Sequence, residues 1–576
     1  MTKNIIYKFA KKGINLSPEA YEKILNTEDP VSFSSSLIVK LKSNKHKKED
    51  LISVSGDIVD KYLNPTAPTT ETKPQEKTKP EPETIKKPTP TPTQKTETKP
   101  TPIKKEEKPQ PTPTPTPKKT EPPEPEPQPE KSKEEQRKED YIKNNSTKNL
   151  MEIEEEAEVS QEFKRNLTKT NVNFDKFEIL TDTTGMSYTS GEVNNIIEYF
   201  NSRYNKLTKI IEKHPEMKAH QKIADIGENQ TDLNLIVMVN EIKTTKNRNN
   251  IVEFEDDTGQ ITVLFSNKNE EAFNLSQRLI KDEVVGVVAD KKDRFSIGNN
   301  IIYPGIPRMS QPNSDCGIVF TSDIHIGSVT FLEDAFVKFI KWINGDYGNE
   351  EQRKIANNVK YLTIDGDIVD GVGIYPNQDK ELAIPDIREQ YEEAARLLGD
   401  IRSDVKIIIC PGNHDATRLA EPQPAIPEKY AKSLHQLNNV EFISNPGYVN
   451  LDGTKVLMYH GRGMDDLAIG VKGFSHERND LIMEELLNIR HLSPIYGERS
   501  SVASEQEDYL VIDDIPNVLH TGHVHINTYK YYKGVHLINS GTFQTQTEYQ
   551  KIYNIVPTPA QVPILDNGEY KQLKFR

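Results

Sequence analysis

The sequence predicts a multidomain protein in which a small β-barrel precedes an α/β domain, with a short helical module joined to them by an extended tether. Three observations support this prediction. The chain has 576 residues, which is too long for one compact domain. Proline is concentrated near the N-terminus, which marks a first boundary. In the C-terminal two thirds, β-branched runs first follow one another closely and then alternate with amphipathic helices.

Residues 1–63 are predicted to form the helical module. In "SPEAYEKIL", Ser17 is a suitable N-cap and Pro18 suits the first helical position. The pentapeptide "GDIVD" occurs here at 56–60 and again at 366–370. Because no cluster of ligand side chains accompanies the first copy, we interpret it as a turn that opens a last short helix.

Residues 64–140 are predicted to be a disordered tether rich in Pro, Thr, Lys and Glu. Of the 38 prolines in the chain, 20 lie between Pro65 and Pro129, in a stretch with almost no aliphatic or aromatic residues. Such a stretch cannot bury enough apolar surface to offset its chain entropy. We expect a spacer, with a docking motif as the alternative.

A mixed helical segment is expected over residues 141–215. Within "GEVNNIIEYFNSRYNKLTKIIEKH", apolar residues recur at the spacing of one helix face. These residues are Val193, Ile196, Ile197, Phe200, Tyr204, Leu207, Ile210 and Ile211.

Residues 216–308 are predicted to form the β-barrel, because short β-branched runs there are separated by Asn, Gly and Asp turn signals. The hairpin "EFEDDTGQITVLF" resembles that of OB-fold domains, which often bind single strands through basic grooves and stacking aromatic residues. This hairpin is acidic and the block has few aromatic residues. We therefore expect a platform for protein contacts, with a DNA groove as the alternative.

Residues 315–576 are predicted to form the α/β domain. Apolar strands alternate there with amphipathic helices such as "IREQYEEAARLL". The expected strands are "CGIVFTS", "KYLTID", "VKIIIC", "KVLMYH" and "NVLHTG". In such an architecture, chemistry is expected where strands end and loops begin.

Composition narrows the class of protein. The net charge is −14, and no long Lys/Arg run follows the tether, so bound nucleic acid would have to meet cations, a local patch or a basic partner. The two cysteines, Cys316 and Cys410, lie in separate apolar runs, which excludes a disulfide framework and favours a reducing compartment. We see neither a signal region nor a membrane span, and expect a cytoplasmic, nucleoid-associated protein without membrane contact.

Polar side chains follow the expected strands of the α/β domain in a distinctive order. Five of the 13 histidines lie in these few positions. The candidate residues are Asp323, His325, Asp367, Asn413, His414, Asp415, His460, His523 and His525. In extended backbone, residues two apart project to one side, so the Asp323/His325 and His523/His525 pairs can each converge on a metal.

This ordered set resembles the calcineurin-like metallophosphoesterase family, over roughly residues 315–545. The resemblance implies an α/β/β/α sandwich with two divalent cations. Asp323, His325 and His525 would hold one cation, Asn413, His460 and His523 the other, and Asp367 would bridge them. His414 would stay unligated near the scissile phosphate, with Asp415 fixing its tautomer.

The expected chemistry is hydrolysis of a phosphodiester. Two cations would neutralise the phosphate and lower the pKa of a bound water, which supplies hydroxide for in-line attack. His414 would stabilise the transition state or protonate the leaving oxygen. Mixed nitrogen and oxygen ligands favour Mn²⁺, Fe or Zn²⁺ over Mg²⁺.

The flanks "GDIVDGVGIYPNQ", "CPGNHDATRLAEPQPA", "YHGRGMDD" and "YNIVPTPAQVPILDNGEYKQLKF" resemble the small subunits of archaeal family-D DNA polymerases. That resemblance implies a proofreading 3′–5′ exonuclease and accessory subunit. Its implied partners are a large catalytic subunit and the DNA 3′ end. For the N-terminal module, a sliding clamp and a primase are both open as partners. The alternatives are a catalytically silent scaffold and a stand-alone phosphodiesterase or phosphatase.

Three loop residues are candidate DNA contacts. Tyr375 would stack on a terminal base or pack against its own loop. Arg418 and Arg462 would pair with backbone phosphates, or with nearby carboxylates as structural ion pairs. The Tyr-rich "NTYKYYKGVHLINSGTF" is interpreted as a pair of core strands, with a DNA-binding stripe as the alternative.

Overall fold

In the computed structural model of the chain, most residues from 174 to the C-terminus are described, together with short stretches nearer the N-terminus. The continuous ranges are 174–186, 189–292, 295–312, 314–552 and 554–576. The short stretches are 14–16, 23–24, 27, 33–34, 37–38, 52–54 and 150–152. The chain divides into two compact units, Met1–Pro123 and Glu124–Arg576.

In the first unit, strand β1 (Ile14–Leu16) pairs in parallel with β2 (Ile52–Val54). The sequence did not predict this pairing, because two three-residue strands so far apart carry little local signal. Residues 23–24 of the expected helix are helical. The first "GDIVD" copy and the predicted tether lie outside the described residues.

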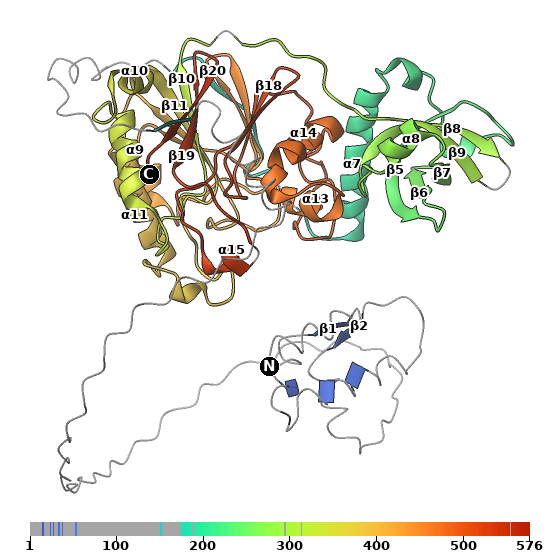
Figure 1. Ribbon diagram of the computed structural model, residues 1–576, viewed down its shortest axis with the longest axis horizontal. Coiled ribbons are helices and arrows are strands. Elements are labelled where there is room, and N and C mark those ends of the chain that lie inside the picture. Colours follow the sequence, from blue (N-terminus) through green and yellow to red (C-terminus); the bar gives the residue numbers. More distant parts are fainter. Residues whose placement is uncertain are drawn as a thin grey trace, which may run out of the picture. The chain divides into compact units, whose positions relative to one another are not determined.

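The second unit contains a closed barrel and a mixed α/β domain, as predicted (Figure 1). The barrel has the strand order β5-β6-β7-β9-β8. Its strands are β5 (Leu233–Thr244), β6 (Asn250–Asp256), β7 (Gly259–Phe265), β8 (Val284–Lys292) and β9 (Phe295–Ile302). Helix α8 (Glu270–Ser276) lies between β7 and β8 in the chain. Alternating residues such as Val252, Phe254 and Val263 point into the barrel and fill its core.

Two sheets form the centre of the α/β domain. The seven-stranded sheet has the order β13-β12-β11-β10-β19-β20-β3. Its strands are β13 (Val440–Phe442), β12 (Lys406–Cys410), β11 (Val359–Asp365), β10 (Gly317–Thr321), β19 (Gln561–Asp566), β20 (Glu569–Lys574) and β3 (Leu150–Glu152). Strands β10, β11, β12 and β13 run parallel to one another.

The six-stranded sheet has the order β17-β18-β16-β15-β14-β4. Its strands are β17 (Thr528–Tyr532), β18 (Val535–Asn539), β16 (Val518–Thr521), β15 (Thr454–Met458), β14 (Gly447–Leu451) and β4 (Phe177–Asp182). The Tyr-rich segment forms the β17–β18 hairpin, which confirms the interpretation as core strands. Strands β3 and β4 show that segment 141–215 completes one edge of each sheet.

The strands alternate their side chains between two cores, which produces four layers. Phe320 and Ile408 of one sheet pack against Val449 and Met458 of the other. Their neighbours on the outer face of the first sheet pack against α9 (Glu333–Ile343), α10 (Glu350–Asn358) and α11 (Ile387–Gly399). Helices α13 (Met464–Gly470) and α14 (Asn479–Ile489) cover the second sheet. The other described helices of the domain are α12 (Lys432–His435) and α15 (Glu548–Ile552).

Helix α7 (Val193–Ile211) lies beside the barrel (Figure 1) and differs in part from its predicted face. Val193 and Ile197 are 71% and 52% exposed, whereas Arg203 is fully buried. The Arg203 guanidinium donates to the Asp508 carboxylate at 2.8 Å and to the Asp282 carbonyl at 2.9 Å. The face of α7 that points inward therefore includes the Arg203 cation and excludes Val193 and Ile197. A pattern of apolar residues cannot predict that a charged residue lies on the buried face.

No described helix combines the length and apolar character needed to span a bilayer. Cys316 and Cys410 are both free and buried.

Candidate metal centre

The predicted site residues gather at one edge of the sandwich, because each follows the carboxyl end of a parallel strand. Asp323 follows β10, Asp367 follows β11, and Asn413 follows β12. From the other sheet, His460 follows β15 and His523 follows β16. The strand order therefore brings together residues that lie up to two hundred positions apart.

Five of the seven predicted ligands have a left-handed backbone, so the extended backbone expected for the Asp323/His325 and His523/His525 pairs was wrong. Their φ angles are 48° at Asp323, 55° at His325, 50° at Asp367, 69° at His523 and 59° at His525. Such a backbone costs a non-glycine residue about 1–3 kcal/mol and persists only where the surroundings enforce it. Local strain is thus concentrated at these side chains, which is typical of functional sites.

Glycines next to the ligands leave no room for a side chain. A Cβ atom at Gly412 would lie 2.2 Å from Oδ1 of Asp367, and one at Gly522 would lie 2.4 Å from Oδ2 of Asp323. The two carboxylates therefore pack directly against backbone.

The first cluster contains Asp323, His325 and His525, whose ligand atoms lie within 4.8 Å of one another. Nε2 of His325 and Nε2 of His525 are 3.0 Å apart, and His525 Nε2 is 3.3 Å from Oδ1 of Asp323. Two ring nitrogens that face each other across a buried carboxylate form a set of donors suited to one cation.

The second cluster contains Asp367, Asn413 and His460. Nε2 of His460 lies 3.3 Å from Oδ2 of Asp367 and 3.2 Å from Oδ1 of Asn413. The same Asp367 oxygen is 3.9 Å from Nε2 of His325, so it lies between the two clusters. His523 approaches this group with its ring centroid 5.3 Å from that of His460.

Hydrogen bonds orient each imidazole. Nδ1 of His325 lies 3.0 Å from Oδ1 of Asp370, and Nδ1 of His460 lies 2.8 Å from the Asp365 carbonyl oxygen. These contacts direct Nε2 of both rings toward the clusters. His523 is held the other way round, with Nε2 3.1 Å from Oδ2 of Asp465, so its Nδ1 remains for a cation.

His414 lies beside the clusters, while Asp415 does not touch it. Nδ1 of His414 is 2.7 Å from the Asp370 carbonyl oxygen, and its Nε2 is 4.0 Å from Oδ2 of Asp367. The expectation that Asp415 fixes the tautomer of His414 is therefore wrong. The Asp415 carboxylate turns inward and accepts hydrogen bonds from the Tyr391 hydroxyl at 3.0 Å and the Gly412 amide at 2.8 Å.

The electrostatics of the site favour a cation. Burial opposes the charged form of Asp367, but His460 and His414 hold its pKa well below the usual range. Burial likewise opposes protonation of His460, yet Asp367 raises its pKa well above that of a free histidine. Every ion pair that Asp323 and Asp367 form within the described part of the chain is with a histidine. These buried carboxylates, imidazoles and an amide oxygen fit divalent metal ions.

The site opens into a cavity of about 560 Å³. Tyr375 lines it, with its hydroxyl donating to Glu381 at 3.0 Å and its ring 6.3 Å from that of His414. Arg462 also lines it. Arg418 does not; its guanidinium donates to Glu505 and to the Pro422 carbonyl, which supports the structural ion pair.

Sequence reasoning missed several residues of this site. Asp370 forms a third potential ligand group with His325 and His414, and Asp465 holds both His523 and His476. Asp370 is the last residue of the second "GDIVD", so its position shortly after Asp367 was the available signal. Asp465 and His476 carried none, because their contacts depend on how α13 packs.

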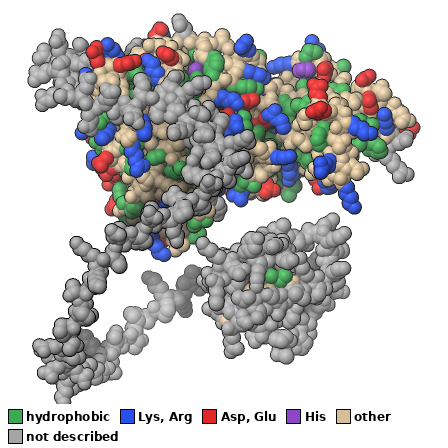
Figure 2. Space-filling model, viewed as in Figure 1, with side chains coloured by type: hydrophobic (Ala, Val, Ile, Leu, Met, Phe, Trp, Pro, Cys, Tyr) green, Lys and Arg blue, Asp and Glu red, His purple; other side chains and the backbone are tan. Residues whose placement is uncertain are grey.

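Charged side chains are mixed over the face shown in Figure 2, where Lys/Arg and Asp/Glu alternate across the barrel and the α/β domain. The described side chains that are visible on this face do not form the single basic stripe that is typical of proteins gripping duplex backbone.

Much of this chain is similar in sequence to known proteins. The profile of the family that comprises the B-subunits of DNA polymerases alpha and epsilon matches residues 318–529. A DNA polymerase II small subunit from Methanothermobacter thermautotrophicus is 61% identical over 69% of this chain and 83% of its own length. The corresponding protein from Archaeoglobus fulgidus is 43% identical over 69% of this chain and 80% of its own.

A solved archaeal phosphodiesterase aligns with 44% of this chain and 98% of its own at 16% identity, with a TM-score of 0.22, which is too low to support a conclusion about the fold. The curated relatives decide the question. The chain belongs to the family of archaeal DNA polymerase II small subunits.

Proposed function

We propose that this chain is a metal-dependent 3′–5′ exonuclease that proofreads as the small subunit of a replicative DNA polymerase. One observation carries the proposal. Asp367 lies between two buried clusters of carboxylate, imidazole and amide donors, at 3.3 Å from His460 and 3.9 Å from His325. That is the arrangement a two-cation phosphodiesterase requires.

The proposal gives each cation its own set of ligands. Asp323, His325 and His525 would hold one, Asn413, His460 and His523 the other, and Asp367 would contribute to both. We favour Mn²⁺, with Fe, Zn²⁺ or Mg²⁺ as alternatives, because mixed nitrogen and oxygen ligands suit Mn²⁺, Fe or Zn²⁺ better than Mg²⁺. Bound cations would neutralise the phosphodiester and make a water molecule acidic enough to attack at neutral pH.

His414 is the residue best placed to act on the substrate itself. Its Nδ1 is anchored on the Asp370 carbonyl at 2.7 Å, so the ring presents Nε2 to the cavity beside Asp367. A protonated Nε2 would donate to a phosphate oxygen or to the leaving oxygen, an effect typically worth about 10²–10⁴ in rate.

The barrel supports the polymerase assignment. Its strand order, with β7 parallel to β9 and a helix between β7 and β8, supports an OB-fold. We assign it as an OB-fold that serves as a platform for protein contacts.

The relatives carry the name small subunit of DNA polymerase II, and we infer that this chain likewise works beside a large catalytic subunit in the cytoplasm. In that role it would act on DNA 3′ ends. The N-terminal module, residues 1–63, is proposed to reach a sliding clamp or a primase.

Purified protein with Mn²⁺ tests the proposal. We expect it to shorten a primer from its 3′ end, and His460→Ala to abolish this activity because Nε2 of His460 contacts both Asp367 and Asn413. His435→Ala is the control, because that ring packs on Phe442 away from the site. A scaffold would leave the primer intact with every divalent cation. A stand-alone phosphodiesterase would cleave small diesters and spare the primer.

A further inference from the structure

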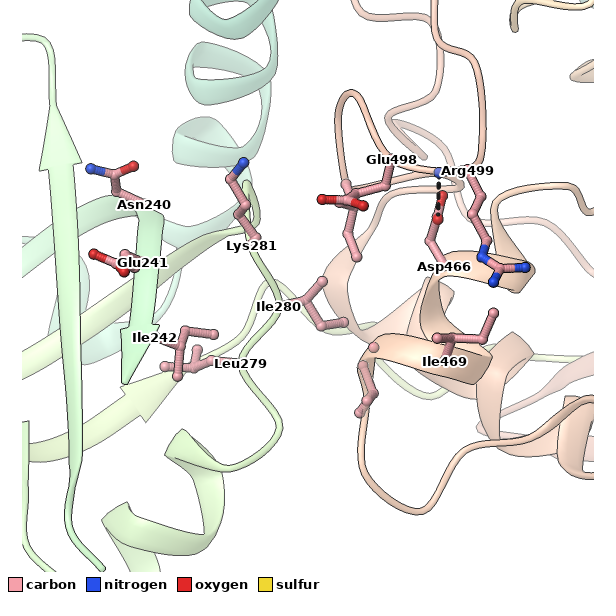
Figure 3. Close-up of a pocket in the computed structure, with 13 residues that line it drawn as sticks. Asn240, Glu241, Ile242, Leu279, Ile280, Lys281, Asp466, Ile469, Glu498 and Arg499 are labelled. Carbon is pink, nitrogen blue, oxygen red and sulfur yellow. Dashed lines mark hydrogen bonds between the residues drawn. The ribbon is translucent and has the colours of Figure 1, made fainter. Parts of the chain in front are cut away.

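A second cavity of about 680 Å³ lies between the barrel and the α/β domain. Figure 3 shows its two walls, with Ile242 and Lys281 on the barrel side and Ile469, Glu498 and Arg499 on the other. We call this cavity the interdomain groove.

The interdomain groove adjoins the candidate metal centre. Ile469 and Arg499 line both cavities, so one wall continues from the metal centre toward the barrel. A nucleic-acid strand that entered the metal centre from this side would pass these two residues.

Arg499 stands on a rigid support. The Asp466 carboxylate accepts hydrogen bonds from the Arg499 amide at 3.0 Å and from the Ser500 amide at 3.1 Å. The Ser500 hydroxyl in turn donates to the Arg462 carbonyl at 2.9 Å. These bonds hold the backbones of Arg462 and Arg499 together, so both arginines project from one fixed frame.

The guanidinium groups of Arg462 and Arg499 make no hydrogen bond or ion pair with any residue that the structure describes. Arg418 differs, because its guanidinium donates hydrogen bonds to Glu505 and to two backbone carbonyls. An exposed guanidinium whose backbone is held at the wall of a cavity is well suited to a phosphate, because its planar fork matches phosphate oxygens.

Two of the three acidic side chains that line the groove have partners within the protein. Glu241 is paired with Lys243, and Asp466 is occupied by the two amides. Glu498 remains as the acidic group that faces Lys281 across the gap (Figure 3). The rest of the surface is largely aliphatic, which suits the sugar and base faces of a nucleotide.

We propose that the strand whose 3′ end enters the metal centre continues into the interdomain groove, where Arg499 binds one of its backbone phosphates. This inference rests on the proposed nuclease function and assigns a strand path and a binding residue to it. The contact positions the strand, and hydrolysis itself belongs to the metal centre.

Two neighbouring substitutions of opposite sign test the path. Binding of a fluorescent single strand of about 8 nucleotides would be measured by anisotropy in EDTA, so that cleavage plays no part. We expect Arg499→Gln to weaken binding about tenfold at low salt and to reduce the slope of log K against log salt by about 0.7. Glu498→Gln should tighten binding severalfold, because it removes a negative charge beside the strand.

Lys472→Gln is the matched control, because Lys472 is an exposed cation just beyond α13 that lines neither cavity. It should bind as the wild type does. With Mn²⁺, Arg499→Gln should raise KM for the oligonucleotide by a larger factor than KM for a p-nitrophenyl thymidine phosphodiester, since that diester is too short to extend into the groove.

The outcomes separate the two proposals. If Arg499→Gln and Glu498→Gln both bind the oligonucleotide as tightly as the wild type, the strand does not use the groove and the inference is overturned, including the case in which a protein partner fills it. If the wild type cleaves neither substrate, the nuclease proposal fails, and the binding measurements still decide the path.

Discussion

Nε2 of His523 lies 3.1 Å from Oδ2 of Asp465, whose other carboxylate oxygen lies 2.8 Å from Nε2 of His476. Burial opposes the charged form of Asp465, but His523 and His476 hold its pKa far below the usual range, so the carboxylate is ionised. It therefore accepts the Nε2 proton of His523 and leaves Nδ1 as the ring's lone-pair donor.

Asp465→Asn should weaken the binding of one cation. The neutral amide would stabilise the tautomer of His523 that carries its proton on Nε2 less strongly than the carboxylate does. Losing such a supporting group typically costs about 10–100-fold in metal affinity. Mn²⁺ titration by calorimetry would measure it, with Asp514→Asn as a control on an exposed carboxylate. Unchanged Mn²⁺ affinity in Asp465→Asn would mean that Asp465 does not orient His523 for a cation.

The buried ion pair between Arg203 and Asp508 should be important for stability. Both side chains are fully buried, and Asp508 also contacts His491 at 2.9 Å. Asp508→Asn leaves the Arg203 charge without its partner, so we expect the free energy of unfolding to fall by about 3–5 kcal/mol.

Urea denaturation would measure this loss, with Lys455→Gln as the control. Lys455 and Asp514 form an ion pair whose side chains are 40% and 58% exposed, and such a pair contributes less than about 1 kcal/mol. If the free energy of unfolding fell equally in the two variants, the buried Arg203–Asp508 pair would contribute no more to stability than an exposed pair.

His536 should make stability depend on pH. Burial lowers its pKa to about 4, so the folded chain keeps this ring neutral where the unfolded chain protonates it. Because the unfolded state binds the extra proton, the contribution is lost as pH falls from about 6.5 toward 4.

Comparison with His536→Gln isolates that effect from the other titrating groups. The free energy of unfolding of the wild type, taken relative to that of His536→Gln, should fall by about 2 kcal/mol between pH 7.5 and pH 5. Denaturation curves at the two pH values would show it. A difference independent of pH would mean that the folded chain protonates His536 as readily as the unfolded chain.

The fold and the position of the site were predictable because their signals are local. Each candidate ligand follows a short β-branched run, and parallel strands place such positions at one edge of a sheet. The five strands expected in the α/β domain all formed, as did helix α11.

What the sequence could not reveal depends on tertiary packing. Asp465 meets His523 across 58 positions, and Asp415 turns toward Tyr391 although it follows His414 directly. Arg203 is buried within an otherwise apolar face, where a charge would be expected outside. Hydrogen-bond partners and buried charges of this kind depend on how distant segments pack in the folded core, which local sequence patterns do not show.

The most direct measurement compares two aspartates that occupy the same position in the same pentapeptide. Asp367 lies between the two ligand clusters, whereas Asp57, in the first "GDIVD", has no accompanying ligand residues in the sequence. Release of nucleotides from a 3′-labelled primer with Mn²⁺ should be abolished by Asp367→Asn and should remain at the wild-type rate in Asp57→Asn. An Asp367→Asn protein that digests the primer as fast as the wild type would contradict the account.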